Sequence, residues 1–283
     1  MKIQTYTIIV GTEACNAHCP FCVSKTTPKA DLKGDEYNHR ILCKGCRLAQ
    51  LSGATTVLLT GKGEPTLYPD MITSYLCTLN KYDFPLIEIQ TNGIALMDES
   101  YNFHLKRWNE MELNTICISA VSMFYEENRI IYGDKYPDLA RLVDKIHNYG
   151  YSIRLSIMML NGFTDSWHKV QGIRNFCKGY GIEQLTLRSI DSPEKGTGKI
   201  VEWIRNHTLS VEHQQAIKNW IEKEGVPVLQ LAHGATIYDV HGQNLCLSNC
   251  LTDDHTDDSM RQLIYFPDGH LRYNWKYEGA ILV

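Results

Sequence analysis

The sequence has no apolar run long enough to span a membrane and no apolar stretch of signal-peptide length after Met1. A spanning helix needs roughly 18 or more consecutive apolar residues, and a secretory signal needs an apolar core of about 7 to 15. Neither kind of segment is therefore present in the sequence. We expect a cytoplasmic protein with no membrane partner.

Net positive charge is also absent. The chain carries 28 Lys and Arg residues against 32 Asp and Glu residues, a formal net charge of −4 at pH 7. Nucleic acids and anionic membranes attract proteins through a positive field, which this balance does not supply over the chain as a whole. We therefore expect no nucleic-acid partner, although a local basic pocket is compatible with the composition.

Repeats and low-complexity segments are missing as well, so the length can be read as globular. With 283 residues, 43% of them apolar, the chain is long enough for one large α/β domain, since single barrels commonly run to roughly 200–250 residues. Short β-rich runs alternate with amphipathic stretches, the pattern of βα units around a parallel sheet. The expected strands are 6–10, 55–60, 86–90, 115–120, 151–159 and 184–189, and the expected helices are 39–52, 70–80, 98–109, 136–149 and 166–180. Beyond them we expect a helix at 210–224 and short strands at 227–231, 235–240, 245–247, 261–266 and 271–275.

Cysteine, by contrast, is abundant. Ten cysteines in a chain without a secretion signal favour reduced thiols and metal ligation over a disulfide framework. Three of them fall in Cys15-Asn16-Ala17-His18-Cys19-Pro20-Phe21-Cys22, directly after the apolar run Thr7–Val10. Thiolates bind iron–sulfur clusters, and a cubane [4Fe–4S] cluster takes four of them. Three thiolates leave one iron open, which is typical of a catalytic site. Zinc is the alternative, although its sites usually show paired CxxC or CxxH units.

Two further motifs close the next two expected strands. Gly61-Lys62-Gly63-Glu64-Pro65 follows the second strand, where glycines let the backbone approach a ligand closely. Thr91-Asn92-Gly93 follows the third and places short polar side chains at the same edge of the sheet. Seen alone, the second motif would be equally well explained as an ordinary Asn-Gly turn.

Together these motifs resemble the radical S-adenosylmethionine (SAM) superfamily, and their pattern is most similar to its molybdenum-cofactor cyclase-like branch. CxxxCxxC with an aromatic residue before the third cysteine, here Phe21, is the superfamily signature. The resemblance implies a [4Fe–4S] cluster held by Cys15, Cys19 and Cys22, with SAM chelating the fourth iron. It further implies that one electron cleaves SAM to methionine and a 5′-deoxyadenosyl radical, which abstracts hydrogen from a substrate.

The resemblance also assigns cofactor contacts and partners. Backbone around Gly61 and Gly63, with Glu64, would receive the SAM ammonium. The remaining expected SAM or substrate contacts are Phe21, Thr91, Asn92 and Ser119. A flavodoxin- or ferredoxin-type protein would supply the electron, and an exposed cluster would make the enzyme oxygen-sensitive. The implied fold is a partial (β/α)6 TIM-type barrel over residues 1–190, with a small β-rich C-terminal extension, 191–283, covering the barrel opening.

Two arginines bear on the substrate. Arg154 is the one charge in an apolar strand, and Arg188 repeats the pattern in the next strand, so both are candidates for binding a substrate or SAM anion. A structural ion pair is the alternative for Arg154. We expect an anionic small-molecule substrate, with a nucleotide as a candidate. The alternatives are a maturase acting on a peptide, protein or tRNA, and a non-catalytic Fe–S or zinc-binding protein.

Four other cysteines leave a second metal site open. Cys43 and Cys46 lie three apart on an expected helix, hence on one face, and Cys246 and Cys250 lie four apart in the C-terminal extension. Four thiols are enough for an auxiliary cluster or a zinc ion. Neither pair has a recognised spacing, and the first expected helix normally packs outside the barrel. Of the two pairs, Cys246 and Cys250 are favoured.

Overall fold

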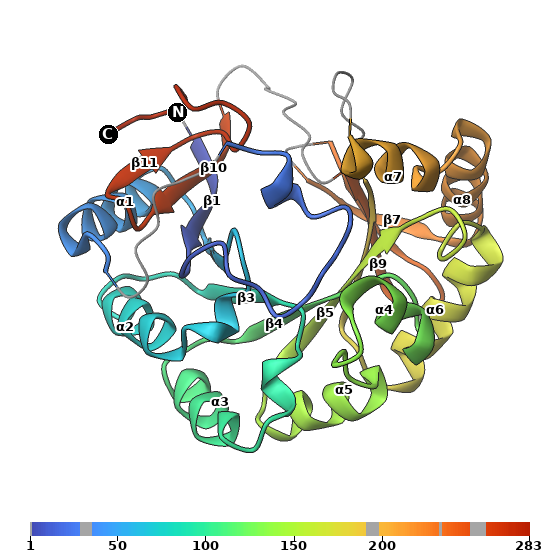
Figure 1. Cartoon of the computed structure of the whole chain (residues 1–283), viewed down its shortest axis with the longest axis horizontal. Coiled ribbons are helices and arrows are strands. Elements are labelled where there is room, and N and C mark those ends of the chain that lie inside the picture. Colours follow the sequence, from blue (N-terminus) through green and yellow to red (C-terminus); the bar gives the residue numbers. More distant parts are fainter. Residues whose placement is uncertain (1, 29–35, 191–197, 232–233, 250–258) are drawn as a thin grey trace.

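An open barrel of parallel strands forms the centre of the molecule (Figure 1). The computed structural model describes residues 2–28, 36–190, 198–231, 234–249 and 259–283. Its eleven-stranded sheet has the order β11-β10-β1-β2-β3-β4-β5-β6-β9-β8-β7. The strands from β10 through β9 each pair in parallel with the next, whereas β11, β8 and β7 are antiparallel additions at the two edges.

The six strands expected from the sequence are all present, with boundaries shifted by a few residues. They are β1 (Lys2–Ile9), β2 (Thr56–Thr60), β3 (Leu86–Thr91), β4 (Thr115–Ala120), β5 (Ser152–Met159) and β6 (Gln184–Ser189). The five expected helices are α1 (His39–Leu51), α2 (Pro69–Leu79), α3 (Tyr101–Glu110), α5 (Leu139–Asn148) and α6 (Trp167–Gly179). These helices ring the outer face of the sheet in Figure 1. Asn38 and Asp138 cap α1 and α5 with their side chains, which sets where each helix begins.

The C-terminal strands continue the barrel sheet at both of its edges. They are β7 (Val226–Gln230), β8 (Thr236–Asp239), β9 (Asn244–Asn249), β10 (Ser259–Phe266) and β11 (His270–Arg272). β10 pairs with β1, and β9 pairs with β6. Six expected barrel strands thereby become eight, and the segment 191–283 contributes strands to the same sheet as residues 1–190.

Two faces of each strand have different surroundings. In β5, Ile153, Leu155 and Ile157 are fully buried against the helices. Arg154 and Ser156 alternate with them and lie half-buried on the inner face. This period of two places apolar side chains under the helix layer and polar side chains in the barrel lumen. The site is therefore built from residues at alternate positions and at the strand ends.

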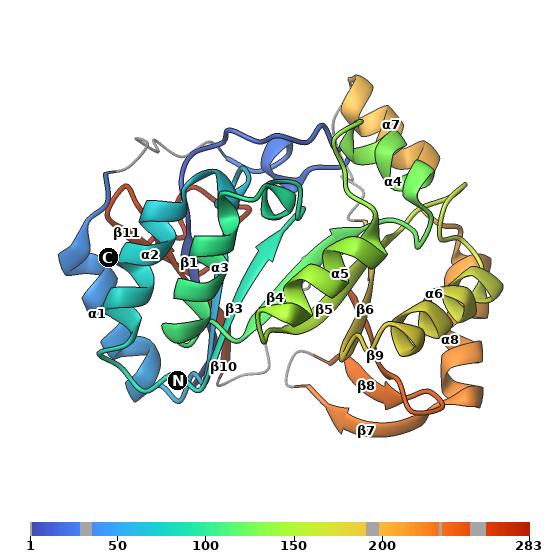
Figure 2. The same cartoon turned by 90° about the horizontal axis from the view of Figure 1, so that it is seen from below.

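Helices α4 (Tyr125–Tyr132), α7 (Lys199–His207) and α8 (Val211–Glu224) complete the chain, and the first two were not expected. Figure 2 shows α4 and α7 on the same side as the segment that follows β1. That side holds the carboxyl ends of the parallel strands, where barrels of this kind carry their chemistry. None of the helices in the described ranges is both long and apolar enough to cross a membrane.

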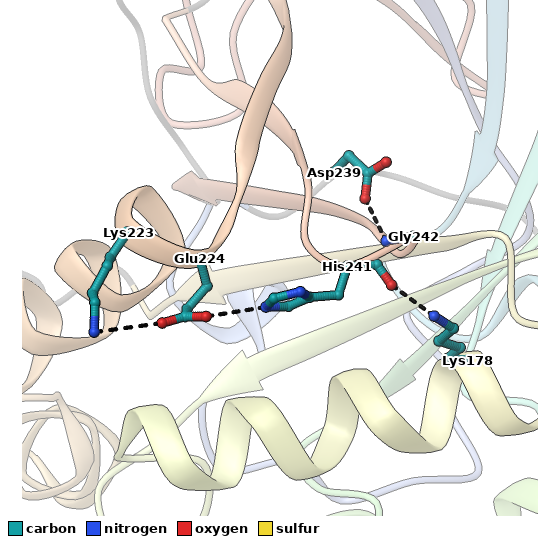
Figure 3. A network of polar contacts seen from close by, with 6 residues as sticks. All are labelled: Lys178, Lys223, Glu224, Asp239, His241 and Gly242. Atoms are coloured by element: carbon teal, nitrogen blue, oxygen red, sulfur yellow. Dashed lines mark hydrogen bonds and ion pairs between the residues drawn. The ribbon is translucent and has the colours of Figure 1, made fainter.

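The opposite end of the barrel carries a polar network around the β8–β9 turn (Figure 3). His241 Nε2 lies 3.1 Å from a carboxylate oxygen of Glu224, and Lys178 Nζ donates to the carbonyl oxygen of His241 at 2.7 Å. Gly242 N donates to Asp239 Oδ1. Because this turn precedes β9, it lies at the amino ends of the parallel strands. We assign the network a structural role.

Candidate functional site at the carboxyl ends of the strands

The three sequence motifs meet at one place. The loop Cys15–Cys22 follows β1 and lies against the ends of the next two strands. Glu64 N donates to the carbonyl oxygen of Ala14 at 2.9 Å, and Asn92 Nδ2 donates to Asn16 Oδ1 at 2.7 Å. The ends of β1, β2 and β3 thus bring three features into a single site. These are the thiols, the GxGEP motif (Gly61–Pro65) and the TNG motif (Thr91–Gly93).

Gly63 is required by how closely this loop approaches. A Cβ atom at Gly63 would lie 2.0 Å from the carbonyl oxygen of Ala14, and one at Gly61 would lie 3.0 Å from the carbonyl oxygen of Gly63. No other residue type fits the first of these positions without moving the backbone. Gly63 therefore lets the cysteine loop rest on the strand end, and the contact of both glycines with SAM stays a prediction.

Glu64 joins the ends of β2 and β3. Its carboxylate is 3% exposed and accepts from Thr66 N at 3.0 Å, from Thr66 Oγ1 at 2.7 Å and from Thr91 Oγ1 at 2.6 Å through Oε1, and from Asn92 N at 2.9 Å through Oε2. Burial raises the pKa of Glu64, and these hydrogen bonds oppose the shift. The carboxylate and the Thr91 hydroxyl are thus engaged within the chain, where they fix Asn92, and their direct contact with SAM or substrate stays a prediction.

Replacing Glu64 by glutamine is expected to lower the free energy of unfolding by about 1–3 kcal/mol, because an amide NH2 would face groups that are themselves donors. Urea denaturation of the apoprotein measures the change. Glu99→Gln, at an exposed position, is the matched control and should have no effect. Equal stability of the two variants would show that Glu64 is not the junction described here.

The three thiols fit a metal cluster. Cys15 is exposed, whereas Cys19 and Cys22 are half-buried. Burial, followed by the neighbouring Cys22 and Cys15 thiols, raises the pKa of Cys19 to about 12. Burial also raises the pKa of Cys15. Neighbouring thiols whose pKa values are raised become thiolates together only when a cation neutralises them, and an iron–sulfur core supplies that positive charge.

The spacing of these thiols is not that of a single ion. Within the described ranges, no group of three or more His, Cys, Asp or Glu side chains is close enough to hold one metal ion. The thiolates around one tetrahedral zinc lie only about 3.8 Å apart, given Zn–S bonds of about 2.3 Å. Cysteines that hold a cubane cluster each bind a different iron atom, so they are spaced more widely.

Asn92 Nδ2 lies 3.9 Å from Cys15 Sγ and can orient this first thiol.

Phe21 is held among aromatic residues from the two helices that the sequence did not predict. Its ring lies 6.5 Å from that of Tyr132 in α4, edge to face, and 6.1 Å from that of Trp203 in α7. His18 N also donates to the carbonyl oxygen of Tyr132 at 3.1 Å. These contacts fix the far end of the cysteine loop. Tyr132 and Trp203 could not be found from motif spacing, because neither belongs to a motif.

A family model described as the radical SAM superfamily matches residues 9–173, more than half of the chain. The chain belongs to the radical SAM superfamily. The enzymes of this superfamily use a [4Fe–4S] cluster and SAM, the two groups that the thiols and the strand-end motifs predict.

Individual relatives agree with this assignment at low identity. The mitochondrial GTP 3′,8-cyclase of Arabidopsis thaliana is 26% identical over 170 residues, which is 58% of this chain and 41% of the plant protein. A structure of Streptococcus suis SuiB bound to S-adenosylmethionine has a TM-score of 0.62 at 14% identity, covering 95% of this chain and 60% of SuiB. SuiB bound to the precursor peptide SuiA gives a TM-score of 0.54 at 16% identity, over 79% of this chain and 47% of SuiB. The two structural matches show the shared fold.

The lumen of this radical SAM barrel contains a buried ion pair. Arg154 Nη2 in β5 contacts Glu88 Oε1 in β3 across the intervening strand β4. Burial alone would lower the pKa of Arg154, but Cys117 and Glu88 beside it raise that pKa above its ordinary value. The ion pair is the alternative that the sequence left open for Arg154. An anion-binding role for Arg154 stays a prediction.

Arg188 lies near Arg154 but has different partners. Burial raises the pKa of the Cys117 and Cys246 thiols, which face the same lumen from β4 and β9, and the positive charge of Arg188 opposes this effect at both thiols. In the part of the chain that the structure describes, Arg188 makes no ion pair, and its buried Nε has no hydrogen-bond partner. Ser119 is half-buried on the inner face of β4, where Tyr136 Oη donates to its carbonyl oxygen at 2.8 Å.

The four cysteines considered for a second metal do not gather. Cys46 is buried and Cys43 is half-buried on the same helix, α1, which packs outside β1. Cys246 belongs to β9, and the lumen arginines Arg154 and Arg188 act on its thiol. Strand β9 lies on the other side of the open barrel from α1 (Figure 1). Cys250 falls outside the described residues. The described members therefore separate into an outer and an inner position, which disfavours one shared site.

Proposed function

We propose that this radical SAM enzyme acts on an anionic small molecule, with a nucleoside phosphate as the first candidate substrate. Cys15, Cys19 and Cys22 would hold the [4Fe–4S] cluster. When bound, the cluster and SAM supply reductive cleavage of SAM and a 5′-deoxyadenosyl radical. The other expected SAM contacts are Phe21, Gly61, Gly63, Glu64, Thr91, Asn92 and Ser119.

The chain's own residues orient these groups and exclude water. Glu64 fixes Asn92 beside the first thiol through Asn92 N, while Thr91 braces the same carboxylate. Tyr132 and Trp203 enclose Phe21 at the other end of the loop. A loop fastened at both ends keeps its three sulfur atoms in position before cofactor binding, which lowers the entropic cost of assembling the site.

The substrate proposal rests on a difference between the two lumen arginines in their acidic partners. Glu88 neutralises Arg154, whereas no described carboxylate contacts Arg188. A half-buried guanidinium without an acid favours an incoming carboxylate or phosphate, which it can bind with two parallel hydrogen bonds. Among the described residues, Arg188 therefore adds to the lumen a positive charge that no carboxylate contacts, in a chain whose overall charge is −4.

Anaerobic turnover tests this proposal. With the cluster reconstituted and reduced, 5′-deoxyadenosine formed from SAM is quantified with and without a panel of nucleoside mono- and triphosphates. We expect one nucleotide to stimulate SAM cleavage several-fold in the wild type and in Arg141→Met, an exposed control on α5. Cleavage indifferent to every nucleotide would contradict the substrate proposal and direct the search to peptides and sugars.

Arg188→Met separates two roles for that residue in the same assay. Loss of the stimulation alone assigns Arg188 to the substrate anion. Loss of unstimulated cleavage, with a raised concentration of SAM at half-maximal rate, assigns it to the SAM carboxylate. A variant that matches the wild type in both measurements would remove Arg188 from the site.

A further inference from the structure

Lys62 is a buried lysine in the middle of the GxGEP motif. Its side chain is only 4% exposed, yet in the described part of the chain it makes no ion pair with a carboxylate. Lysine is almost never buried unless an opposite charge accompanies it, because removing an ammonium from water is costly. The position therefore requires a physical explanation beyond the close approach of the two glycines.

The ammonium of Lys62 binds the chain that leaves the cysteine loop. Nζ donates to Thr27 Oγ1 at 3.0 Å and also to the carbonyl oxygen of Pro28. Thr27 Oγ1 in turn donates at 3.0 Å to the carbonyl oxygen of Val23, the residue after the third cysteine. Lys62 thus reaches from the end of β2 to the segment immediately behind Cys22.

The charges around Lys62 point to the thiols. Burial lowers the pKa of Lys62; the Glu13 carboxylate raises it, the Arg272 guanidinium lowers it, and the Cys22 thiol raises it. Glu13 is exposed, so water screens much of its effect. Three thiolates around a metal core would place a concentrated negative charge in the loop that Lys62 holds from behind. The proposed function, on which this argument rests, supplies that charge.

We propose that Lys62 compensates charge at the cluster: its ammonium, held by Thr27 and Pro28 behind the cysteine loop, stabilises the reduced cluster and raises its reduction potential. The step is the transfer of one electron from an external reductant such as dithionite to the oxidised cluster, with no bond formed or broken. Reduction adds one negative charge, and a nearby fixed positive charge stabilises the more negative state. Net charge beside a cluster is one of the means by which proteins set its potential.

Lys25 provides an internal comparison. Its Nζ donates to the carbonyl oxygen of Cys19 at 2.9 Å, so it too is tied to the cysteine loop. Unlike Lys62, its side chain is exposed. Water and salt screen an exposed charge much more than a buried one. We therefore expect the potential to depend strongly on Lys62 and weakly on Lys25.

The test is an anaerobic potentiometric titration of the reconstituted cluster, followed by electron paramagnetic resonance, on the wild type, Lys62→Gln, Lys62→Arg and Lys25→Gln. Glutamine keeps an NH donor for Thr27 and Pro28 but removes the charge. We expect Lys62→Gln to lower the ratio of reduced to oxidised cluster at a fixed potential about tenfold, which is 59 mV for one electron. Lys62→Arg should stay near the wild type, and Lys25→Gln should change the ratio less than twofold.

Iron and sulfide content, measured on every sample, separates the outcomes. A Lys62→Gln protein with a full cluster and an unchanged potential would overturn the proposal, as would an equal shift in Lys25→Gln. If Lys62→Gln does not retain iron, Lys62→Arg decides: a wild-type potential supports compensation by charge, and a lowered potential overturns it. A wild-type protein that assembles no cluster would instead contradict the proposed function.

Discussion

Cys19→Ala is expected to lose the [4Fe–4S] cluster and to reduce SAM cleavage to the level of the blank. Cys19 is the middle ligand of the proposed three in the sequence, and both other thiols act on its half-buried sulfur. Two thiolates would leave two irons without a protein ligand, so the cluster would lack both its charge balance and its fixed geometry. Iron analysis, the visible absorption spectrum and 5′-deoxyadenosine formation measure the loss.

Cys77→Ala is the matched control for this prediction. Cys77 is an exposed free cysteine on α2, and nothing in the proposed site uses it. Iron content and SAM cleavage should equal those of the wild type. A Cys19→Ala protein that retained a full cluster would refute the ligand assignment, and an equal loss in Cys77→Ala would show that the assay reports general thiol damage.

Arg154→Met is expected to lower the free energy of unfolding by about 3 kcal/mol, because it leaves the Glu88 carboxylate buried without its partner. The side chains of Arg154 and Glu88 are 19% and 12% exposed, so the effect should fall at the lower end of the range of about 3–5 kcal/mol for broken buried pairs. Urea denaturation of the apoprotein measures the change without involving the cluster or SAM.

The double variant Arg154→Met/Glu88→Gln separates the ion pair from simple loss of packing. Removing both charges leaves no unpaired carboxylate, so the double variant should be more stable than Arg154→Met alone. Strict additivity of the two single changes would contradict a direct interaction between the side chains. Arg141→Met, on the exposed face of α5, serves as the control for replacing an arginine.

The sequence was sufficient to predict features that depend on residues close together in the chain. The six strands and the three motifs follow from short runs of residue types, and βα alternation places the carboxyl ends of successive strands side by side. Helix α4 was missed because Tyr125–Tyr132 is shorter than the window in which helical periodicity becomes visible. The contacts of Phe21 with α4 and α7 were hidden for the same reason.

Pairings between distant residues could not be predicted. Arg154 stood out as a lone charge, but its partner Glu88 lies 66 positions away on a strand that is not adjacent to β5. The expected strands near 245–247 and 261–266 were found, whereas the sequence does not state that β9 and β10 pair at opposite edges of the barrel. Lys62 was visible within its motif, but only the fold shows that its ammonium is buried behind Cys22.

The central claim is that Cys15, Cys19 and Cys22 hold a cluster that cleaves SAM at the ends of β1 to β3. Its most direct test is to reconstitute the protein anaerobically, reduce it with dithionite, and quantify 5′-deoxyadenosine and methionine formed from SAM. The wild type should form the two products in equal amounts, and a protein with all three cysteines replaced by alanine should form neither. A wild-type protein with an intact, reduced [4Fe–4S] cluster that binds SAM and yields no 5′-deoxyadenosine would contradict the account.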